Sequence, residues 1–238
     1  MTPQALIQAH PRLYHMADAG AWPSIREHGL LSTSAILDRV GLDGPEREAL
    51  EASRRPERVP LAGTGFVLRD QKPLNEALLA RALRGGTPPA DWLRLLNRYV
   101  FFWASRARLA TLLAARAYRG REHDVLVVDT ARLLERHAER VRLTSMNTGS
   151  TPRYPAPRDA SSFSRIEDFP ARARSGAPAK EVVEVCVERA VPDIADLVIE
   201  VRRMRDGEAG DPCADGGSAQ GVMARATATT SVDPYVDR

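Results

Sequence analysis

The chain has few cysteines and few long apolar runs, and each shortage excludes a class of protein. Its 238 residues include only Cys186 and Cys213, which excludes a disulfide framework and a zinc motif built on paired cysteines. No stretch of 18 apolar residues occurs, so we expect no membrane span. The first residues lack a basic stretch followed by an apolar one, so we expect no signal peptide and a cytoplasmic protein.

The sequence also lacks the motifs of several large enzyme classes. It contains no glycine-rich dinucleotide or phosphate loop, no H-E-x-x-H and no G-x-S-x-G. The five histidines are not spaced as metal ligands, so we expect no metal. Kinase, Rossmann, zinc hydrolase and serine hydrolase functions therefore lose their main support.

Lysine is scarce, and the basic charge is carried almost wholly by arginine. Of the 34 basic residues only Lys72 and Lys180 are lysines. Residues 206–238 carry a net charge of −4 against +3 for the whole chain, so residues 1–205 carry +7. Arginine suits planar, bidentate contact with phosphate, which permits a nucleotide or nucleic-acid ligand. A GC-rich genome would also enrich arginine.

Strand and helix patterns alternate irregularly from residue 1 to 205, which predicts one α+β domain. The composition of residues 206–238, which is acidic and rich in Gly, Ala and Ser, predicts a disordered tail. Residues 13–30 are expected to form a strand, a turn and a short helix that ends at Gly29. Further strands are expected at 65–68, 98–105, 123–129, 140–144, 181–188 and 196–203, and further helices at 45–54, 73–84, 89–97, 106–118 and 130–138.

Two polar residues lie within apolar strand patterns. Glu184 stands in the middle of "KEVVEVCVERAVP", where a buried carboxylate is costly unless it is paired or faces a cleft. The alternatives are an edge strand with a solvated face and a carboxylate directed at a ligand. His15 in "LYHMAD" is either a core histidine whose ring is hydrogen-bonded within the protein or a residue that contacts a ligand. The "FFW" run at 101–103 is likewise typical of core when taken alone.

The order of these features resembles the ADP-ribosyltransferase superfamily, and DarT-like enzymes within it. The resemblance rests on "LYHMADAGAWPSIREHGL", "YVFFWASRARL" and "EVVEVCVERAVPDI". The chain is also similar to an uncharacterised bacterial family of that superfamily through "HGLLSTS", "RDQKPL" and "VFFW", over about residues 11–200. The resemblance implies a split antiparallel sheet with flanking helices, and NAD as the ADP-ribose donor.

The resemblance also implies roles for individual residues. Glu184 would be the catalytic acid, and Asn147 would lie in a loop that receives the acceptor. The implied NAD-binding residues are His15, Ser32, Thr33, Arg69, Phe102, Trp103 and Arg106. Position 17 departs from the pattern, because Ala17 stands where such enzymes often have a hydroxyl, which puts one ribose contact in doubt.

The implied activity is glycosyl transfer from NAD to a nucleic acid base in DNA or RNA, as a bacterial toxin or antiphage effector. A protein acceptor and an antitoxin partner fit the resemblance too. One alternative is an NAD-dependent RNA 2′-phosphotransferase, for which Arg12, Arg69 and Arg116 would hold a phosphate. The other is a non-catalytic nucleotide- or RNA-binding module on the same fold.

Overall fold

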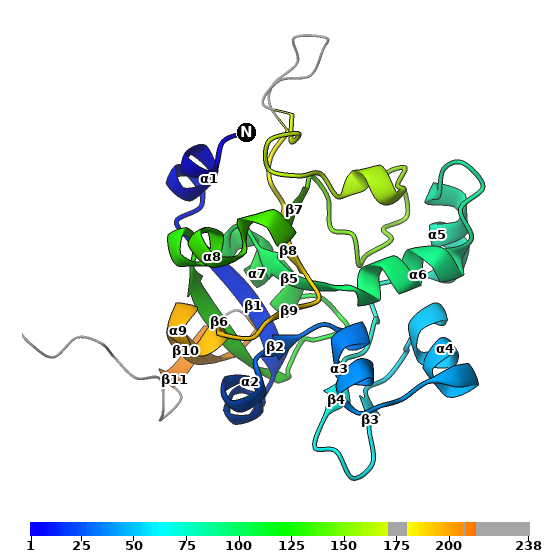
Figure 1. The fold of residues 1–238 in the computed structure, drawn as a ribbon, viewed down its shortest axis with the longest axis horizontal. Helices are drawn as coiled ribbons and strands as arrows, with labels where there is room; N and C mark the ends of the chain where they lie inside the picture. Colours follow the sequence, from blue (N-terminus) through cyan, green and yellow to red (C-terminus); the bar gives the residue numbers. More distant parts are fainter. Residues whose placement is uncertain (171–179, 207, 213–238) are drawn as a thin grey trace, which may run out of the picture.

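The computed structural model describes residues 1–170, 180–206 and 208–212, and its centre is one antiparallel sheet (Figure 1). The strands lie in the order β11-β10-β6-β1-β5-β8-β7. They are β1 (Arg12–Asp18), β5 (Tyr99–Trp103), β6 (Glu122–Asp129), β7 (Val141–Thr144), β8 (Glu184–Glu188), β10 (Val198–Arg205) and β11 (Glu208–Pro212). Two short antiparallel pairs lie outside it: β2 (Leu30–Leu31) with β9 (Ala190–Val191), and β3 (Val59–Pro60) with β4 (Val67–Leu68).

Helices cover both faces of this sheet, and four of them gather beyond one side of it (Figure 1). That group is α3 (Thr33–Arg39), α4 (Gly44–Ala52), α5 (Glu76–Ala82) and α6 (Pro89–Asn97). The others are α1 (Pro3–Ala9), α2 (Trp22–His28), α7 (Arg106–Leu113), α8 (Thr130–His137) and α9 (Ile194–Leu197), with 3₁₀ turns η1 (Ala138–Arg140) and η2 (Ala160–Ser162). The mixed helix and antiparallel-sheet class expected from the sequence is confirmed.

The core is divided into three clusters, one on the first face of the sheet and two on the second. The first face packs Leu13 and Phe102 against α1, α8 and α9. On the second face, α7 packs against Met16, whereas α5 and α6 pack against Cys186 of β8. The two clusters of the second face meet near β5, and this boundary is where the candidate site lies.

Strand β6, an inner strand of the sheet, follows directly from the sequence. The run "VLVV" in β6 is buried on both faces, because β6 lies between β1 and β10 and helices cover the sheet. Ser105 caps α7 as expected, its hydroxyl accepting from the Arg108 N–H at 3.4 Å. In β6 and at the start of α7, the structure therefore matches what the local sequence pattern predicts.

Several expectations differ from the structure. The helix expected at 106–118 ends at Leu113, the strand expected at 181–188 begins at Glu184, and the first residues of the strand expected at 196–203 belong to α9. Glu184 does not lie on an edge strand, because β8 is paired on both sides, with β5 and β7. Ser32 and Thr33 open an unexpected helix, α3, in which the Ser32 hydroxyl accepts from the Ala35 N–H at 3.2 Å. Strand β11 occupies part of the segment expected to be a tail, and residues 213–238 lie outside the described residues.

Gly29 allows the end of α2 to lie directly against the turn after β9. Its φ is +84°, and a Cβ there would stand 2.7 Å from Cα of Pro192. A side chain at this position would meet both a conformational penalty and rigid backbone. The glycine of the "HGL" motif is therefore required by packing.

We expect Gly29→Ala to destabilise the protein by about 3 kcal/mol, since strained φ and overpacking add. The matched control is Gly20→Ala, which has a φ of +82° but nothing within 4 Å of its Cβ. That control should lose about 1 kcal/mol. Urea denaturation compares the two, and equal losses would show that contact with Pro192 does not matter.

Candidate functional site

Strands β1 and β5 separate soon after they pair, and this opening forms the site. Their ladder has the single residue pair Tyr14–Trp103 within the described chain. Continuing that register would put Met16 opposite Phe101. The backbone carbonyls of Phe101 and Met16 accept hydrogen bonds from side chains instead. The His15 ring bonds the Phe101 oxygen at 2.8 Å, and Arg69 Nη1 donates to the Met16 oxygen. The opening is thus built from specific side chains.

His15 presents a neutral ring at this opening. Because the Phe101 carbonyl can only accept, Nδ1 carries the proton and donates to it. Burial lowers the pKa of His15 to about 4; the bond to Phe101 opposes this shift and the charge of Arg69 adds to it. Nε2 is therefore a hydrogen-bond acceptor at neutral pH, suited to a ligand hydroxyl.

Two adjoining cavities, of about 260 and 390 Å³, meet at the opening. Both are lined by His15, Met16, Thr33 and Arg69. The smaller, here called the Glu184 cavity, extends to Glu184 of β8. The larger, here called the α2 cavity, extends along α2 and the β3–β4 hairpin. A ligand with two linked parts would fill both.

Glu184 is held firmly by one of its two oxygens. The residue is 4% exposed, and Oε2 accepts from the Thr148 hydroxyl at 2.8 Å and the Thr148 N–H at 3.2 Å. The Thr144 hydroxyl lies 3.1 Å from the same oxygen. Oε1 has one longer contact, 3.3 Å from the Thr148 N–H. Oε1 is therefore the oxygen more available to a ligand.

Burial also changes the acidity of this carboxyl. It raises the pKa of Glu184 to about 7, although the Thr148 and Thr144 donors and the charge of Arg158 oppose the shift. At neutral pH the group is divided between its protonated and ionised forms. A carboxyl of this kind beside a cavity is typical of functional sites.

Trp103 is the aromatic residue beside Glu184, whereas Phe102 belongs to the core. The β5–β8 register places Trp103 opposite Glu184, so both side chains lie on one face of the sheet. Phe102 is on the other face and 1% exposed, with its ring edge toward His15 at 5.8 Å. Of the two aromatic candidates, Trp103 has the better position for stacking on a ligand.

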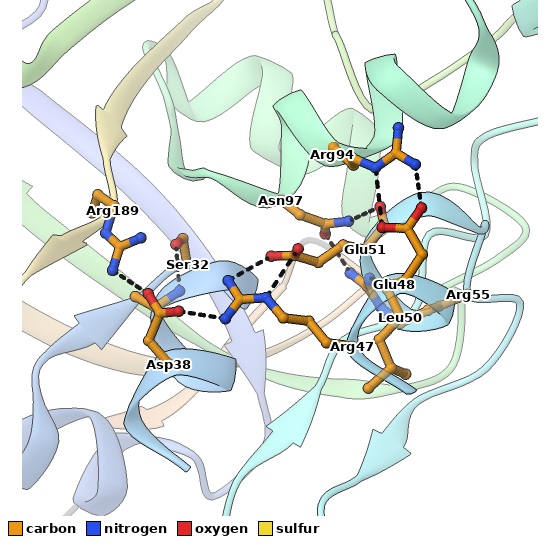
Figure 2. A network of polar contacts seen from close by, with 11 residues as sticks. Ser32, Asp38, Arg47, Glu48, Leu50, Glu51, Arg55, Arg94, Asn97 and Arg189 are labelled. Atoms are coloured by element: carbon orange, nitrogen blue, oxygen red, sulfur yellow. Dashed lines mark hydrogen bonds and ion pairs between the residues drawn. The ribbon is translucent and has the colours of Figure 1, made fainter. Parts of the chain in front are cut away.

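Thr33 lies on the walls of both cavities and is fixed by a buried arginine, Arg55. Arg55 is 6% exposed, and its Nη2 donates to Thr33 Oγ1 at 3.2 Å and to Asn97 Oδ1 at 2.9 Å. Figure 2 shows Arg55 and Asn97 in a polar network that continues through Glu51 and Arg47 to Asp38, and so joins α6, α4 and α3. This network attaches the helical group to the site.

Arg69 lies between the cavities, beside a tyrosine that the sequence analysis missed. Its guanidinium carbon is 5.2 Å from the Tyr118 ring centre, and its Nη2 is buried without a hydrogen-bond partner among the described residues. The Tyr118 hydroxyl donates to Asp70 Oδ1 at 3.1 Å. Tyr118, Asp70, Arg55 and Thr148 come from loops or turns whose local sequence carries no distinctive spacing.

The other candidates divide into one near the site and several away from it. Asn147 lines the Glu184 cavity, as expected for the segment before β8. Ser32 is buried and serves as a helix cap, and Arg106 is exposed at the start of α7, so neither lines the two cavities. Arg12 and Arg116 are likewise exposed and line neither cavity.

Within the described ranges, no three His, Cys, Asp or Glu side chains are grouped to hold a metal ion. The helices in these ranges include none long and apolar enough to cross a membrane. Both findings concern these residues only.

Comparison with known proteins gives a family without an assigned activity. Residues 11–198 match the family described as a family of unknown function, DUF7002. No curated protein matches the chain. The matched range contains the opening between β1 and β5, both cavities and Glu184. The chain belongs to the DUF7002 family.

Proposed function

We propose that this protein is an ADP-ribosyltransferase with NAD as its donor substrate. The observation that carries the proposal is the joint position of His15 on β1 and Glu184 on β8, which line one cavity beside the opening between β1 and β5. We also assign the fold to the split-sheet type of this superfamily, on the basis of the β1–β5 opening.

The residues around the opening have chemistry suited to a dinucleotide. Nε2 of His15 can accept from a ribose hydroxyl, and the unpartnered Nη2 of Arg69 can donate to a pyrophosphate oxygen. The flat ring of Trp103 can stack on nicotinamide next to Glu184. The two adjoining cavities match the two halves of such a ligand. Ala17 supplies no hydroxyl at this position, whereas Thr33 has one and lines both cavities.

The proposed transfer reaction depends on the positive charge that develops on the ribose. When the bond between ribose C1′ and nicotinamide breaks, nicotinamide leaves as a neutral molecule with the bonding electrons, and positive charge develops on the ribose. Ionised Glu184 accepts a hydrogen bond from the ribose 2′-hydroxyl at Oε1 and opposes that charge. The acceptor atom then bonds C1′ and releases its proton to solvent.

We propose a base in DNA or RNA as the acceptor. Residues 1–205 carry +7, almost wholly as arginine, and such a charge favours a polyanion. Asn147 lies on the cavity wall near Glu184, and its amide can both donate to and accept from the edge of a base. A cytoplasmic toxin or antiphage effector, restrained by an antitoxin, would have these properties.

The experiment that tests this function uses NAD labelled in its adenylate part, with DNA, RNA and protein pools offered separately. Label in nucleic acid together with free nicotinamide supports the proposal, and Glu184→Gln should give neither. Label in protein alone would overturn the nucleic-acid acceptor. NAD binding without nicotinamide release would indicate the non-catalytic module. Toxicity of the wild type on expression, absent in the variant, is the cellular counterpart.

The phosphotransferase alternative gains no support, because Arg12 and Arg116 do not line the cavities beside Arg69.

We expect transfer to increase with pH through about 7, because the carboxylate form of Glu184 is the active one. The His15 ring is already neutral above its pKa of about 4 and adds no step between pH 5 and 8. Initial rates at low NAD concentration from pH 5 to 9 measure this profile. A profile flat across this range would contradict the assigned role of Glu184.

A further inference from the structure

Arg158 is a buried arginine that binds the backbone of the segment between β7 and η2. It is 2% exposed, although charged residues are seldom buried without a specific role. Its Nη1 donates to the carbonyls of Thr148 at 3.1 Å and Ser150 at 2.9 Å, and its Nε donates to the Ala156 carbonyl at 3.2 Å. One guanidinium thus fixes three points of an otherwise irregular segment.

Arg158 is itself anchored to the helical group. Its N–H donates to the Ala82 carbonyl at 2.9 Å, and its carbonyl accepts from the Arg84 N–H at 3.1 Å. The guanidinium carbon lies 5.8 Å from the ring centre of Trp92, a buried residue of α6. At Arg158 the segment is therefore held beside α5 by main-chain hydrogen bonds and against α6 by the guanidinium.

The segment that Arg158 holds is the one that holds Glu184. The Thr148 carbonyl accepts a hydrogen bond from Arg158, and the Thr148 N–H and hydroxyl both donate to Oε2 of Glu184. We propose that Arg158 is a positioning residue, which fixes Thr148 so that Oε2 is held and Oε1 faces the substrate. This inference rests on the proposed function in assigning Oε1 to the donor ribose.

The choice of arginine follows from geometry and charge. Nη1 donates to two of the carbonyls and Nε to the third, so the donors lie on two separate nitrogens of one rigid group, which a lysine ammonium does not have. Its positive charge also favours the ionised form of Glu184, the form that the proposed chemistry requires. Arg158 therefore acts on Glu184 through Thr148 and through its charge.

The test measures the titration of Glu184 directly, by ¹³C NMR of glutamate carboxyls, with Glu184→Gln to assign the signal. We expect Arg158→Leu to shift the midpoint upward by about one pH unit or more, since the positive charge is lost and Thr148 is no longer held in place to donate to Glu184. Arg158→Lys, which keeps the charge, should give a smaller upward shift. The control is Arg153→Leu, an exposed arginine of the same segment that stacks on Tyr154, and it should titrate like the wild type.

Kinetics give a second readout. Arg158→Leu should lower kcat for transfer about 10-fold or more while KM for NAD changes less than about 2-fold. If Arg158→Leu does not fold, the Arg158→Lys titration decides. Folded variants that titrate like the wild type would overturn the positioning role. A wild type without transferase activity would overturn the proposed function, whereas the titration would still decide the role of Arg158.

Discussion

Glu184→Gln is expected to lower ADP-ribosyl transfer by roughly 10²–10³-fold, the usual cost of losing one group that stabilises transition-state charge. The amide keeps the size of the side chain but cannot carry the negative charge that opposes positive charge on the ribose. NAD binding should change little, because His15, Arg69 and Trp103 remain in place. Nicotinamide release and labelled-product formation at pH 8 measure the effect.

The same substitution should make the protein more stable at high pH. Burial raises the pKa of Glu184 to about 7, so the folded state binds this proton more tightly than the unfolded state, and wild-type stability falls as pH rises from 4.5 to 7. Glutamine does not ionise, so its burial carries no cost that increases with pH. Between pH 4.5 and pH 8 the variant should gain about 3 kcal/mol relative to the wild type, measured by urea unfolding.

Glu181→Gln is the matched control for both effects. Glu181 lies just before β8 and is exposed, and its hydrogen bond with Arg108 lowers its pKa. Its loss should leave transfer unchanged, and any change of stability with pH should have the opposite sign. An active Glu184→Gln enzyme, or one with the wild-type pH dependence of stability, would show that the carboxyl is not the buried functional acid.

Arg55→Met should destabilise the protein by about 3–5 kcal/mol, because it removes a buried charged donor and leaves its partners unpaired. Methionine keeps an unbranched apolar stem in place of the arginine stem and donates no hydrogen bond. The carbonyls of Leu50 and Arg69, at 2.6 and 3.1 Å, lose a donor, as does the Asn97 side chain. Burial lowers the pKa of Arg55 to about 10, so the side chain is charged at neutral pH.

NAD binding should weaken in the same variant. Arg55 fixes Thr33 and the backbone of Arg69, both of which line the two cavities. Urea unfolding and calorimetric titration with NAD measure the two effects. Arg58→Met is the control for stability alone, since Arg58 lines the α2 cavity but makes only an exposed ion pair with Asp18, worth at most about 1 kcal/mol. Equal stability losses in both variants would contradict a structural role for the Arg55 network.

Much of the fold could be predicted because its signals are local. The apolar run of β6, the aromatic alternation of β5 and the helix at 89–97 lie where composition and spacing indicated them. Ser105 caps its helix as expected, and Gly29 ends α2 with a positive φ. Helix α3 was missed because the hydroxyls of "LSTS" were interpreted as ligand contacts, whereas Ser32 caps the helix.

The site itself was less predictable, because most of its contacts join distant parts of the chain. Arg55 and Arg158 occur in stretches rich in arginine and proline, where nothing distinguishes a buried arginine from an exposed one. Their burial depends on carbonyls that only folding brings near. The same is true of Thr148, whose two donors reach Glu184 from a separate segment.

By itself the sequence determined which residues bear chemistry: a histidine and a glutamate within apolar strands, near an aromatic run. Their types and spacing are local properties that survive without a structure. Only the tertiary structure decided that β1 and β5 separate, that β8 is an inner strand and that His15 and Glu184 line one cavity. These features depend on strand order and helix packing, which long-range burial sets and local pattern does not.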